Sequence, residues 1–410
     1  MTNWQEVKLG DVCDVKGGKR LPKGVNLITI KNTHPYIRVR DLGQSKRLQL
    51  NENYEYVDDE TQKIISHYIV SEDDVLISIV GTIGLIGIVG NSLNNANLTE
   101  NCVKLINLRG IDKDFLYYFL ISNSGQDAIK QGTVGAVQAK LPIKNIQTIQ
   151  VPLPHLDVQK KIAGVLGALD DKIELNNKIN NNLEQQAQAL FKSWFVDFEP
   201  FDGTMPKDWK ESDIYSISNI IYGAPFASKL FNTEKKGLPI IRIRDLKNQH
   251  SDTYTEEIHP KAYIIKAGDI VVGMDGEFRP YIWGNDEGLL NQRVCVFENK
   301  RSLGKMFLYL TIKPLLNRVE QTEVATTVIH IGKQDFDAFR FSMPSNSILD
   351  KFDAVTQPIY NKIVSNSLEN TRLASLRDAL LPKLMSGKID VSKVDISALT
   401  STDKLSFTGV

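Results

Sequence analysis

The stretch Ile37-Arg38-Val39-Arg40-Asp41-Leu42 returns later in the chain as Ile241-Arg242-Ile243-Arg244-Asp245-Leu246. Each copy follows a tryptophan segment, at Trp4 and at Trp209, and precedes a Phe-Leu-Tyr triplet. The spacing between matching residues falls from 204 (Ile37 to Ile241) to 190 (Ile173 to Ile363), as small deletions in one copy would produce. A repeat of this length far exceeds the units of solenoids and propellers. The sequence therefore predicts two homologous domains. Two similar domains suggest a protein that binds two similar targets.

Composition places the chain among ordinary globular proteins. Its 410 residues are 42% hydrophobic and 24% charged, and the length predicts two to three domains. The cysteines Cys13, Cys102 and Cys295 are too few and too far apart for a disulfide framework, which favours a reducing, cytoplasmic location. No basic-then-apolar leader opens the chain, and acidic residues and glycines interrupt the most apolar run, 69–89, so we expect no membrane span.

Strand and helix signals alternate irregularly in both repeats. Short β-branched or apolar runs bounded by Gly, Asn and Pro predict strands at 36–39, 75–80, 103–108, 148–153, 239–243, 270–273 and 293–297. Residues 115–122 and 126–129 predict a short helix. The expected fold class is α+β, with two homologous mixed α/β recognition domains. Two long antiparallel coiled-coil helices join them around a pseudo-two-fold axis.

A long helical stripe follows each globular part. Apolar residues recur at steps of four and three from Ile162 to Trp194, and the same pattern returns from Phe352 to Leu384. Antiparallel pairing would place Asn176 opposite Asn370; a parallel pairing would match the asparagines as well, but the connectivity favours the antiparallel one. Alternatively, the asparagines cap or fray separate helices. The predicted pairing residues are Ile173, Asn176, Asn180, Leu183, Ile363, Asn366, Asn370 and Leu373.

Prolines and composition set the expected boundaries. Pro358 should kink the second helix or mark its first turn, and Pro382 with Gly387 should end it. The predicted segments are a first recognition domain (1–154), a first central helix (155–199), a second recognition domain (200–345), a second central helix (346–390) and a polar tail (391–410).

Catalytic motifs are absent from the sequence. The glycines between Gly81 and Gly90 do not form a dinucleotide loop, and neither a phosphate-binding Gly-Lys-Ser/Thr motif nor an amino-methyltransferase tetrapeptide occurs. The run from Asp275 to Arg279 is spaced too tightly for a nuclease metal centre, and no Cys/His spacing predicts zinc. We therefore expect a non-catalytic chain without metal or cofactor.

Basic and polar loops are the remaining candidates for ligand binding. The segment 16–23 offers four cations beside backbone amides, either as a phosphate site or as a solvated loop. Arg38 and Arg40 should share a strand face and contact bases, or else pair with Asp41; the second copy offers the same choice. Loops that differ between the copies, and Trp283, add side chains suited to base or backbone contact. The predicted DNA-binding residues are Lys16, Lys19, Arg20, Lys23, Arg38, Arg40, Thr82, Thr133, Gln138, Arg242, Arg244, Arg279, Tyr281, Arg293, Thr327 and His330.

Over essentially its full length the chain resembles the specificity subunits of type I restriction–modification enzymes. The resemblance rests on the Trp-x-x-x-x-Leu opening at 4–9, the duplicated Ile-Arg-x-Arg-Asp-Leu, Pro-Leu-Pro at 152–154, Gln-Lys-Lys-Ile-Ala at 159–163 and the segment 380–387. The second copy departs from the pattern, because it lacks both Pro-Leu-Pro and the Gln-Lys-Lys-Ile run.

This resemblance implies non-catalytic recognition of an asymmetric, bipartite site in double-stranded DNA. Each domain would read one half-site, and the helices would set the gap. It implies two modification subunits that methylate adenine N6 with S-adenosylmethionine, and restriction subunits that use ATP, with Mg expected on these partners. A net charge of zero, from 49 basic and 49 acidic residues, slightly favours the alternative of a bivalent protein scaffold without DNA. The basic loops and the resemblance oppose that alternative.

Overall fold

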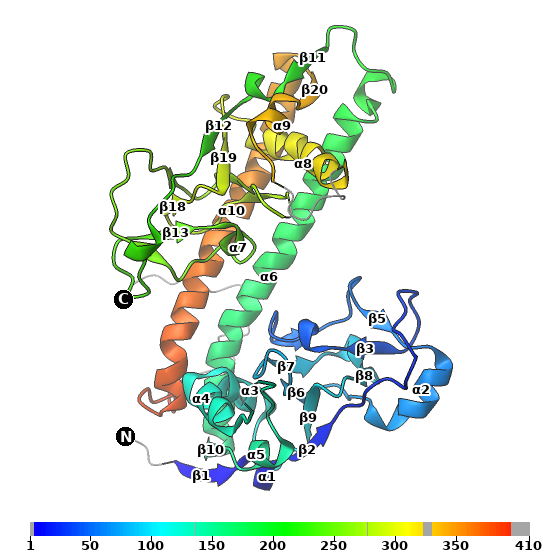
Figure 1. Ribbon diagram of the computed structural model, residues 1–410, viewed down its shortest axis with the longest axis vertical. Coiled ribbons are helices and arrows are strands. Elements are labelled where there is room, and N and C mark those ends of the chain that lie inside the picture. Colours follow the sequence, from blue (N-terminus) through cyan, green and yellow to red (C-terminus); the bar gives the residue numbers. More distant parts are fainter. Residues whose placement is uncertain (1–3, 136, 277, 323–329, 395–410) are drawn as a thin grey trace. The chain divides into compact units, whose positions relative to one another are not determined.

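The computed structural model describes residues 4–135, 137–276, 278–322 and 330–394. The chain forms two compact units (Figure 1). The first contains the residues up to Asp171 and those from Ala374 onward, and the second contains Lys172–Leu373. Each unit therefore includes one globular repeat and a part of each of the two long helices.

The first unit is built on three sheets. A five-stranded sheet has the order β2-β9-β6-β7-β4, a three-stranded sheet the order β5-β3-β8, and β1 pairs with β10. The strands are β1 (Gln5–Lys8), β2 (Asp14–Gly17), β3 (Pro35–Ile37), β4 (Arg47–Leu48), β5 (Glu55–Tyr56), β6 (Val75–Ser78), β7 (Ile86–Val89), β8 (Asn97–Leu98), β9 (Cys102–Ile106) and β10 (Gln150–Leu153). The helices are α1 (Leu9–Val12), α2 (Asp59–Ile65), α3 (Lys113–Ile121), α4 (Asn123–Gly132) and α5 (Ile143–Gln147), with 3-10 turns η1 (Val39–Asp41), η2 (Ser66–Tyr68) and η3 (Asn91–Leu93).

The second unit has the same plan. Its sheets have the orders β12-β19-β16-β17 and β14-β13-β18-β15, and β11 pairs with β20. The strands are β11 (Lys210–Asp213), β12 (Ser218–Tyr222), β13 (Leu238–Ile241), β14 (Tyr254–Thr255), β15 (Ile264–Ile265), β16 (Ile270–Gly273), β17 (Pro280–Ile282), β18 (Gly288–Leu290), β19 (Val294–Asn299) and β20 (Arg340–Met343). The helices are α7 (Ile243–Leu246), α8 (Lys305–Thr322) and α9 (Lys333–Asp337), with 3-10 turns η4 (Glu199–Phe201), η5 (Ile214–Ser216) and η6 (Ser228–Leu230).

Matching strands carry the duplication into the backbone. Strand β3 pairs in parallel with β8 and antiparallel with β5, and β13 pairs in the same way with β18 and β14. The central strands β6 and β16 are buried along their whole length, as expected of the apolar runs 75–78 and 270–273. The predicted mixed α+β domains are therefore present, and both repeats use one framework.

The duplicated arginine motif is not a strand, contrary to the prediction. Strand β3 ends at Ile37 and β13 at Ile241, and both chains then turn into short helices, η1 and α7. The reason is a capping carboxylate: Asp41 Oδ2 accepts the backbone N–H of Arg38 at 2.7 Å, and Asp245 Oδ2 that of Arg242 at 3.0 Å. The two arginines of each motif therefore do not share a strand face.

Two smaller predictions also need correction. The segment predicted as one short helix is two helices, because Ser122 ends α3 and its hydroxyl accepts the N–H of Gly125 to begin α4. The strand predicted from Arg293 begins at Val294, and Arg293 itself lies in the preceding turn.

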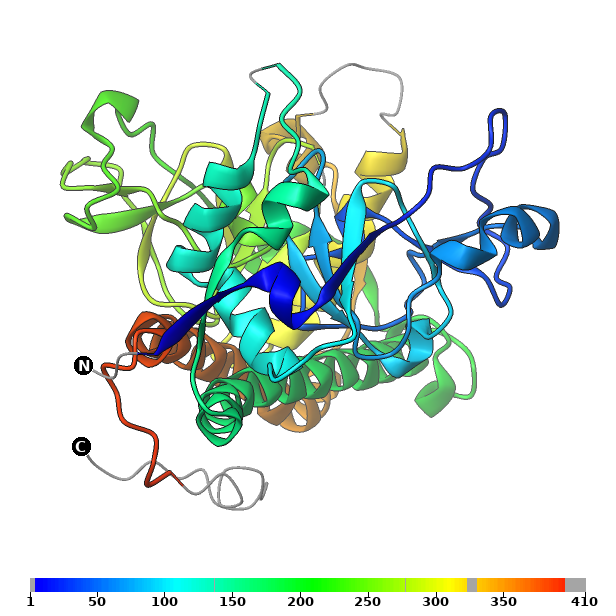
Figure 2. The same cartoon turned by 90° about the horizontal axis from the view of Figure 1, so that it is seen from below.

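The two long helices are α6 (Leu156–Phe195) and α10 (Asn346–Met385), and they pack side by side (Figure 2). In the second unit, Asn176 Nδ2 donates to Asn370 Oδ1 at 2.9 Å, and Asn366 Nδ2 donates to Asn180 Oδ1 at 2.9 Å. In the first unit, Arg377 Nη1 lies 2.7 Å from Asp170 Oδ1. Since the numbers of facing residues run in opposite directions, the helices are antiparallel.

Pro358 lies inside α10, and the helix continues on both sides of it. The helix begins twelve residues earlier, at Asn346, so the prediction that Pro358 marks the first turn is wrong. Proline removes the hydrogen bond to the carbonyl of Ala354, but Ala354 is exposed, so that water can reach this part of the helix. The helix also runs through Pro382 and ends at Met385, before Gly387 with φ of 66°.

The start of α6 is tied to its globular domain by one buried amide. Gln159 is 0% exposed, and its Nε2 donates to the carbonyls of Pro154 at 2.8 Å and Gly110 at 3.0 Å. Its Oε1 accepts the N–H of Asp112 at 2.8 Å. The start of α10 uses another device: Arg301 Nη2 lies 3.0 Å from the buried Asp353 Oδ2.

We expect Gln159→Leu to lower the free energy of unfolding of the first unit by about 2–4 kcal/mol, because it removes a buried amide that binds three backbone groups, one of them the buried carbonyl of Pro154. Urea denaturation followed by circular dichroism measures the change. Gln131→Leu, on an exposed position of α4, is the control and should shift stability by less than about 0.5 kcal/mol. Equal effects of the two substitutions would contradict the anchoring role of Gln159.

Candidate nucleic-acid interface

Two exposed loops of the first repeat lie next to each other. The β6–β7 loop contains the exposed Thr82, and the carbonyl of Thr82 accepts the hydroxyl of Ser78 at 2.6 Å. The second loop follows α4, and its residue Lys140 forms bridges with both Val80 and Val134. The N–H of Leu141 then donates to the carbonyl of Ile79 at 3.0 Å. The structure thus brings together two segments that differ between the repeats.

The predicted residues of the second loop have different roles. Gln138 is exposed at its tip. The hydroxyl of Thr133 donates to the carbonyl of Ile129 at 2.9 Å, so this side chain helps to end α4. Gln138 is therefore the better candidate for a ligand contact.

The second repeat pairs the equivalent loops. The N–H of Ile331 donates to the carbonyl of Met274 at 2.9 Å, and Asp275 bridges to His330. Arg293 joins them, with Nη1 3.3 Å from Asp275 Oδ1. Arg293 and His330 are thus brought into one cluster. Thr327 lies outside the described residues.

Two backbone amides of the basic segment 16–23 are used within the fold. The N–H of Gly18 donates to the carbonyl of Cys102 at 3.0 Å, and the N–H of Lys19 to that of Leu98 at 2.8 Å. A Cβ on Gly18 would lie 2.1 Å from the carbonyl oxygen of Thr99, which explains the glycine. These two amides are therefore not free to bind a phosphate group, and the phosphate site of this segment stays a prediction.

The cations of this segment nevertheless stay near the surface. Lys16, Lys19, Arg20 and Lys23 are exposed. Arg20 Nε lies 2.7 Å from Glu100 Oε1, and Lys19 Nζ lies 5.4 Å from the ring centre of Tyr68. These side chains are suited to contact with a polyanion.

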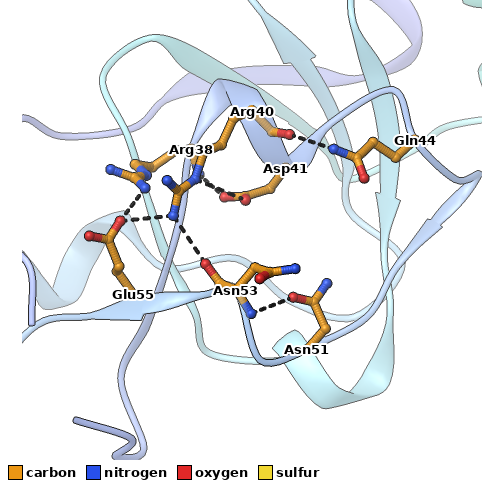
Figure 3. A network of polar contacts seen from close by, with 7 residues as sticks. All are labelled: Arg38, Arg40, Asp41, Gln44, Asn51, Asn53 and Glu55. Atoms are coloured by element: carbon orange, nitrogen blue, oxygen red, sulfur yellow. Dashed lines mark hydrogen bonds and ion pairs between the residues drawn. The ribbon is translucent and has the colours of Figure 1, made fainter. Parts of the chain in front are cut away.

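Both arginines of the first motif converge on Glu55 (Figure 3). Arg38 forms an ion pair with Glu55, and Arg40 Nη2 donates to Glu55 Oε2 at 2.9 Å and to the carbonyl of Asn53 at 3.0 Å. The Arg40–Asp41 contact is longer, at 3.7 Å. The expectation of arginine–carboxylate pairing thus has the right chemistry, but the main partner is Glu55.

The second motif divides the two roles between its arginines. Arg242 Nε donates to Asp245 Oδ2 at 3.1 Å, and its Nη2 donates to the hydroxyl of Thr253 at 2.7 Å. Arg244 is exposed and makes no hydrogen bond or ion pair within the described ranges. Arg244 is therefore available to a ligand, whereas Arg242 is used to hold the turn.

Three further candidates of the second repeat lie in different surroundings. Trp283 is 1% exposed and donates to the carbonyl of Asp286 at 2.9 Å, so it belongs to the core and not to a base-contacting surface. Arg279 and Tyr281 line a cavity of about 830 Å³, together with residues of α6 and α8 such as Glu184 and Lys313. The described residues that line this cavity include neither Arg293 nor His330.

Asp41 predicts a pH dependence of stability. Its side chain is 10% exposed, and burial raises its pKa to about 6, with Glu55 adding to the shift and Arg40 opposing it. Since this value exceeds the unfolded pKa of about 3.9, the contribution of Asp41 to stability is fully present below pH 4 and is lost as pH rises through 6. We expect Asp41→Asn to remove this loss, so that the variant gains up to about 3 kcal/mol relative to the parent between pH 4 and pH 7.

Urea denaturation of both proteins at each pH measures the difference, in which the other carboxylates cancel. Parallel curves for parent and variant would contradict the assignment. Asp14→Asn is a useful control, because the pKa of the half-buried Asp14 is lowered by its hydrogen bonds to Asn107 and Arg109. Its pH dependence should have the opposite sign.

The described residues contain no group of three or more His, Cys, Asp or Glu side chains that could hold a metal ion. Among the described helices, none is long and apolar enough to cross a membrane.

Comparison with known proteins identifies the family. The model of the type I restriction modification DNA specificity domain matches residues 1–185 and 206–371. The chain belongs to this family. It is the DNA specificity subunit of a type I restriction–modification system, the non-catalytic part that acts in a complex with other subunits and DNA. Specificity subunits carry no cofactor of their own.

Relatives align over most of the specificity subunit. The MjaIX specificity subunit of Methanocaldococcus jannaschii is 25% identical, over 96% of this chain and 95% of its own length. The HindI specificity subunit of Haemophilus influenzae is 25% identical, over 67% and 77%. The crystal structure of the S subunit from M. genitalium has the same fold, with a TM-score of 0.53 and 17% identity over 93% of this chain and 96% of that one.

Sequence reasoning missed three residues of the candidate interface. Glu55 lies outside the duplicated motif, and only its charge beside Arg38 and Arg40 could have suggested it. The sequence around Asp275 suggests only a metal ligand, and not a partner of Arg293. Asn101 occupies in the first repeat the place of Arg293, since the N–H of Ile79 donates to the carbonyl of Asn101 at 2.8 Å and that of Met274 to Arg293 at 2.9 Å.

Proposed function

We propose that this specificity subunit reads an asymmetric, bipartite sequence in double-stranded DNA, with one half-site bound by each globular repeat. The supporting observation is the pair of adjoining loops in each repeat, carried on one framework by the same backbone bonds, from Leu141 to Ile79 and from Ile331 to Met274. Two domains that share a backbone framework and differ in their loops are suited to binding different DNA sequences in the same way. The two reading domains are 1–154 and 200–345.

The surfaces beside the loops supply the remaining contacts. Exposed cations of the first repeat, including Lys16, Lys19 and Lys23, are placed on DNA phosphates, which fix position without reading bases. In the second repeat Arg244 has the same role. Gln138 and Thr82 are placed on base edges, whereas Arg38 and Arg242 hold turns.

The long helices act in this proposal as a ruler and a docking platform. Helices 155–199 and 346–390 set the gap between half-sites, and two modification subunits dock on them. Those subunits methylate adenine N6 with S-adenosylmethionine, and restriction subunits that use ATP and Mg join the complex in the cytoplasm. Two linked readers gain effective concentration only when both half-sites have the right spacing and phase.

Methylation mapping tests the proposal. The subunit is expressed with the modification subunit of its own operon, and the modified DNA is sequenced. One asymmetric, gapped motif with methyladenine on each strand is the expected result. A stable complex that modifies DNA at a continuous or symmetric site would contradict it.

A further inference from the structure

The turn that carries Arg293 is held rigidly by backbone hydrogen bonds. The N–H of Val294 donates to the carbonyl of Asn291 at 2.9 Å, and that of Gln292 to the carbonyl of Ala224 at 3.0 Å. The carbonyl of Arg293 itself accepts the N–H of Met274 at 2.9 Å. The Cα of Arg293 is therefore fixed between β18 and β19, next to the two adjoining loops.

Asp275 orients the guanidinium of Arg293. One carboxylate oxygen, Oδ1, lies 3.3 Å from Arg293 Nη1 and 2.7 Å from His330 Nδ1. With its proton on Nδ1, His330 donates to the same oxygen and holds the carboxylate in place. The Arg293 side chain is nevertheless 53% exposed, so the contact orients it without covering it.

The remaining nitrogens of this guanidinium face no partner within the described part of the chain. Nε and Nη2 of Arg293 make no hydrogen bond there, which leaves two parallel N–H groups on one edge. Such an edge matches O6 and N7 of guanine in the major groove, and no other base offers two acceptors at this spacing. An arginine already held by a carboxylate loses less side-chain entropy on binding.

The equivalent position of the first repeat carries a different base-reading group. Asn101 accepts the corresponding backbone bond from Ile79, and Gly18 and Gly223 approach the neighbouring strands in the same way, each with a carbonyl oxygen 2.1 Å from a Cβ built on the glycine. The frameworks therefore superpose at this point, while the side chain changes from an amide to a guanidinium. A position that is constant in backbone and variable in side chain suits the reading of different bases.

We propose that Arg293 determines a guanine in the half-site bound by the second repeat, and that Asp275 is the positioning residue for it. This rests on the proposed function, and it assigns one base to one side chain. A phosphate contact by Arg293 would instead weaken binding to all sequences alike.

Methylation mapping of variants in the full complex tests the assignment. Arg293→Gln should lower the preference for guanine at one position of one half-site by about tenfold to a hundredfold and leave the other positions unchanged. Asp275→Asn should weaken the same preference by a smaller factor, because the arginine remains but loses its charged support. Arg340→Gln is the matched control. Arg340 lies on β20 and donates to the carbonyls of Asp337 and Phe339, and the motif of this variant should equal that of the parent.

Three outcomes are distinguishable. A relaxed single position supports the assignment. A gapped parental motif that Arg293→Gln leaves unchanged at every position, or weakens uniformly, overturns it while the bipartite reading stands. A parental complex with no gapped motif overturns the proposed function itself. Circular dichroism of each variant separates these results from misfolding.

Discussion

Four residues inserted after Asn180 and four more inserted after Ser365 will lengthen the preferred gap between the half-sites by one or two base pairs. Each insertion adds one turn, about 6 Å, to its helix, and each base pair adds about 3.4 Å to the DNA. Since α6 and α10 are antiparallel, the segment after Asn180 faces the segment before Asn366. The two insertions therefore face each other, and both half-sites should stay unchanged.

A second double insertion supplies the control. Turns placed after Asn180 and after Asn370 look equally reasonable from the asparagine pattern, but Asn370 faces Asn176. On both sides of the asparagine pairs, the residues of one helix would then be displaced by one turn from the residues that they face on the other helix. This variant should be less stable and should lose activity at every gap length.

Methylation mapping against a library of sites with different gaps measures both results. An unchanged gap in the matched variant would show that the helices do not set the spacing. Loss of one half-site would show that the helices carry base contacts.

The asparagine pattern illustrates how much of this architecture the sequence predicts. Apolar residues at helical spacing, with a pair of asparagines in the middle, predict packing against a second helix. In that packing Asn176 and Asn180 contact polar partners on the second helix. The duplicated segments also predict two domains of one fold, because a repeated sequence must solve the same packing problem twice. Long, periodic features of this kind depend little on distant contacts.

The arginine motif shows where such reasoning fails. Alternation of apolar residues and arginines from Ile37 to Arg40 has the period of a strand, yet one aspartate three residues after Arg38 caps the backbone and turns it. The hydrogen bond from the Arg38 N–H to Asp41 is local and polar, and it decides the backbone conformation against the apolar period. The partner of both arginines, Glu55, comes from another strand, so only tertiary structure reveals it.

The sequence alone also fails to align the two candidate base-contacting residues, Asn101 and Arg293. Cys102 and Cys295 invite a match of the two β-strands, but the strand registers pair Cys102 with Ser78 and Val294 with Gly273. Cys102 therefore corresponds to Val294, one residue earlier than the cysteines suggest. Only this register shows that Asn101 and Arg293 occupy the same place.

Arg377→Ala should lower the stability of the first unit by about 2–4 kcal/mol, because it leaves the carboxylate of Asp170, which is only 14% exposed, without its cation. Arg377 interrupts the apolar stripe of α10, and the structure explains why. Its Nη1 lies 2.7 Å from Asp170 Oδ1, and the hydroxyl of Tyr118 donates to Asp170 Oδ2 at 2.6 Å. Burial is the largest single effect on Arg377 and lowers its pKa, but the hydrogen bonds and charge interactions with Asp170 and Asp378 together outweigh burial and raise the pKa of the guanidinium.

Two further variants separate the ion pair from general damage to the helix. Asp378→Ala removes the other partner of Arg377, but that carboxylate is 64% exposed and its loss should cost less than about 1 kcal/mol. The double variant Asp170→Asn with Arg377→Met should recover most of the stability, because it removes both charges and keeps an acceptor for Tyr118. Urea denaturation of the parent, the double variant and its two single variants, Asp170→Asn and Arg377→Met, gives the coupling energy. Additive losses in the double variant would show that the two charges do not stabilise each other.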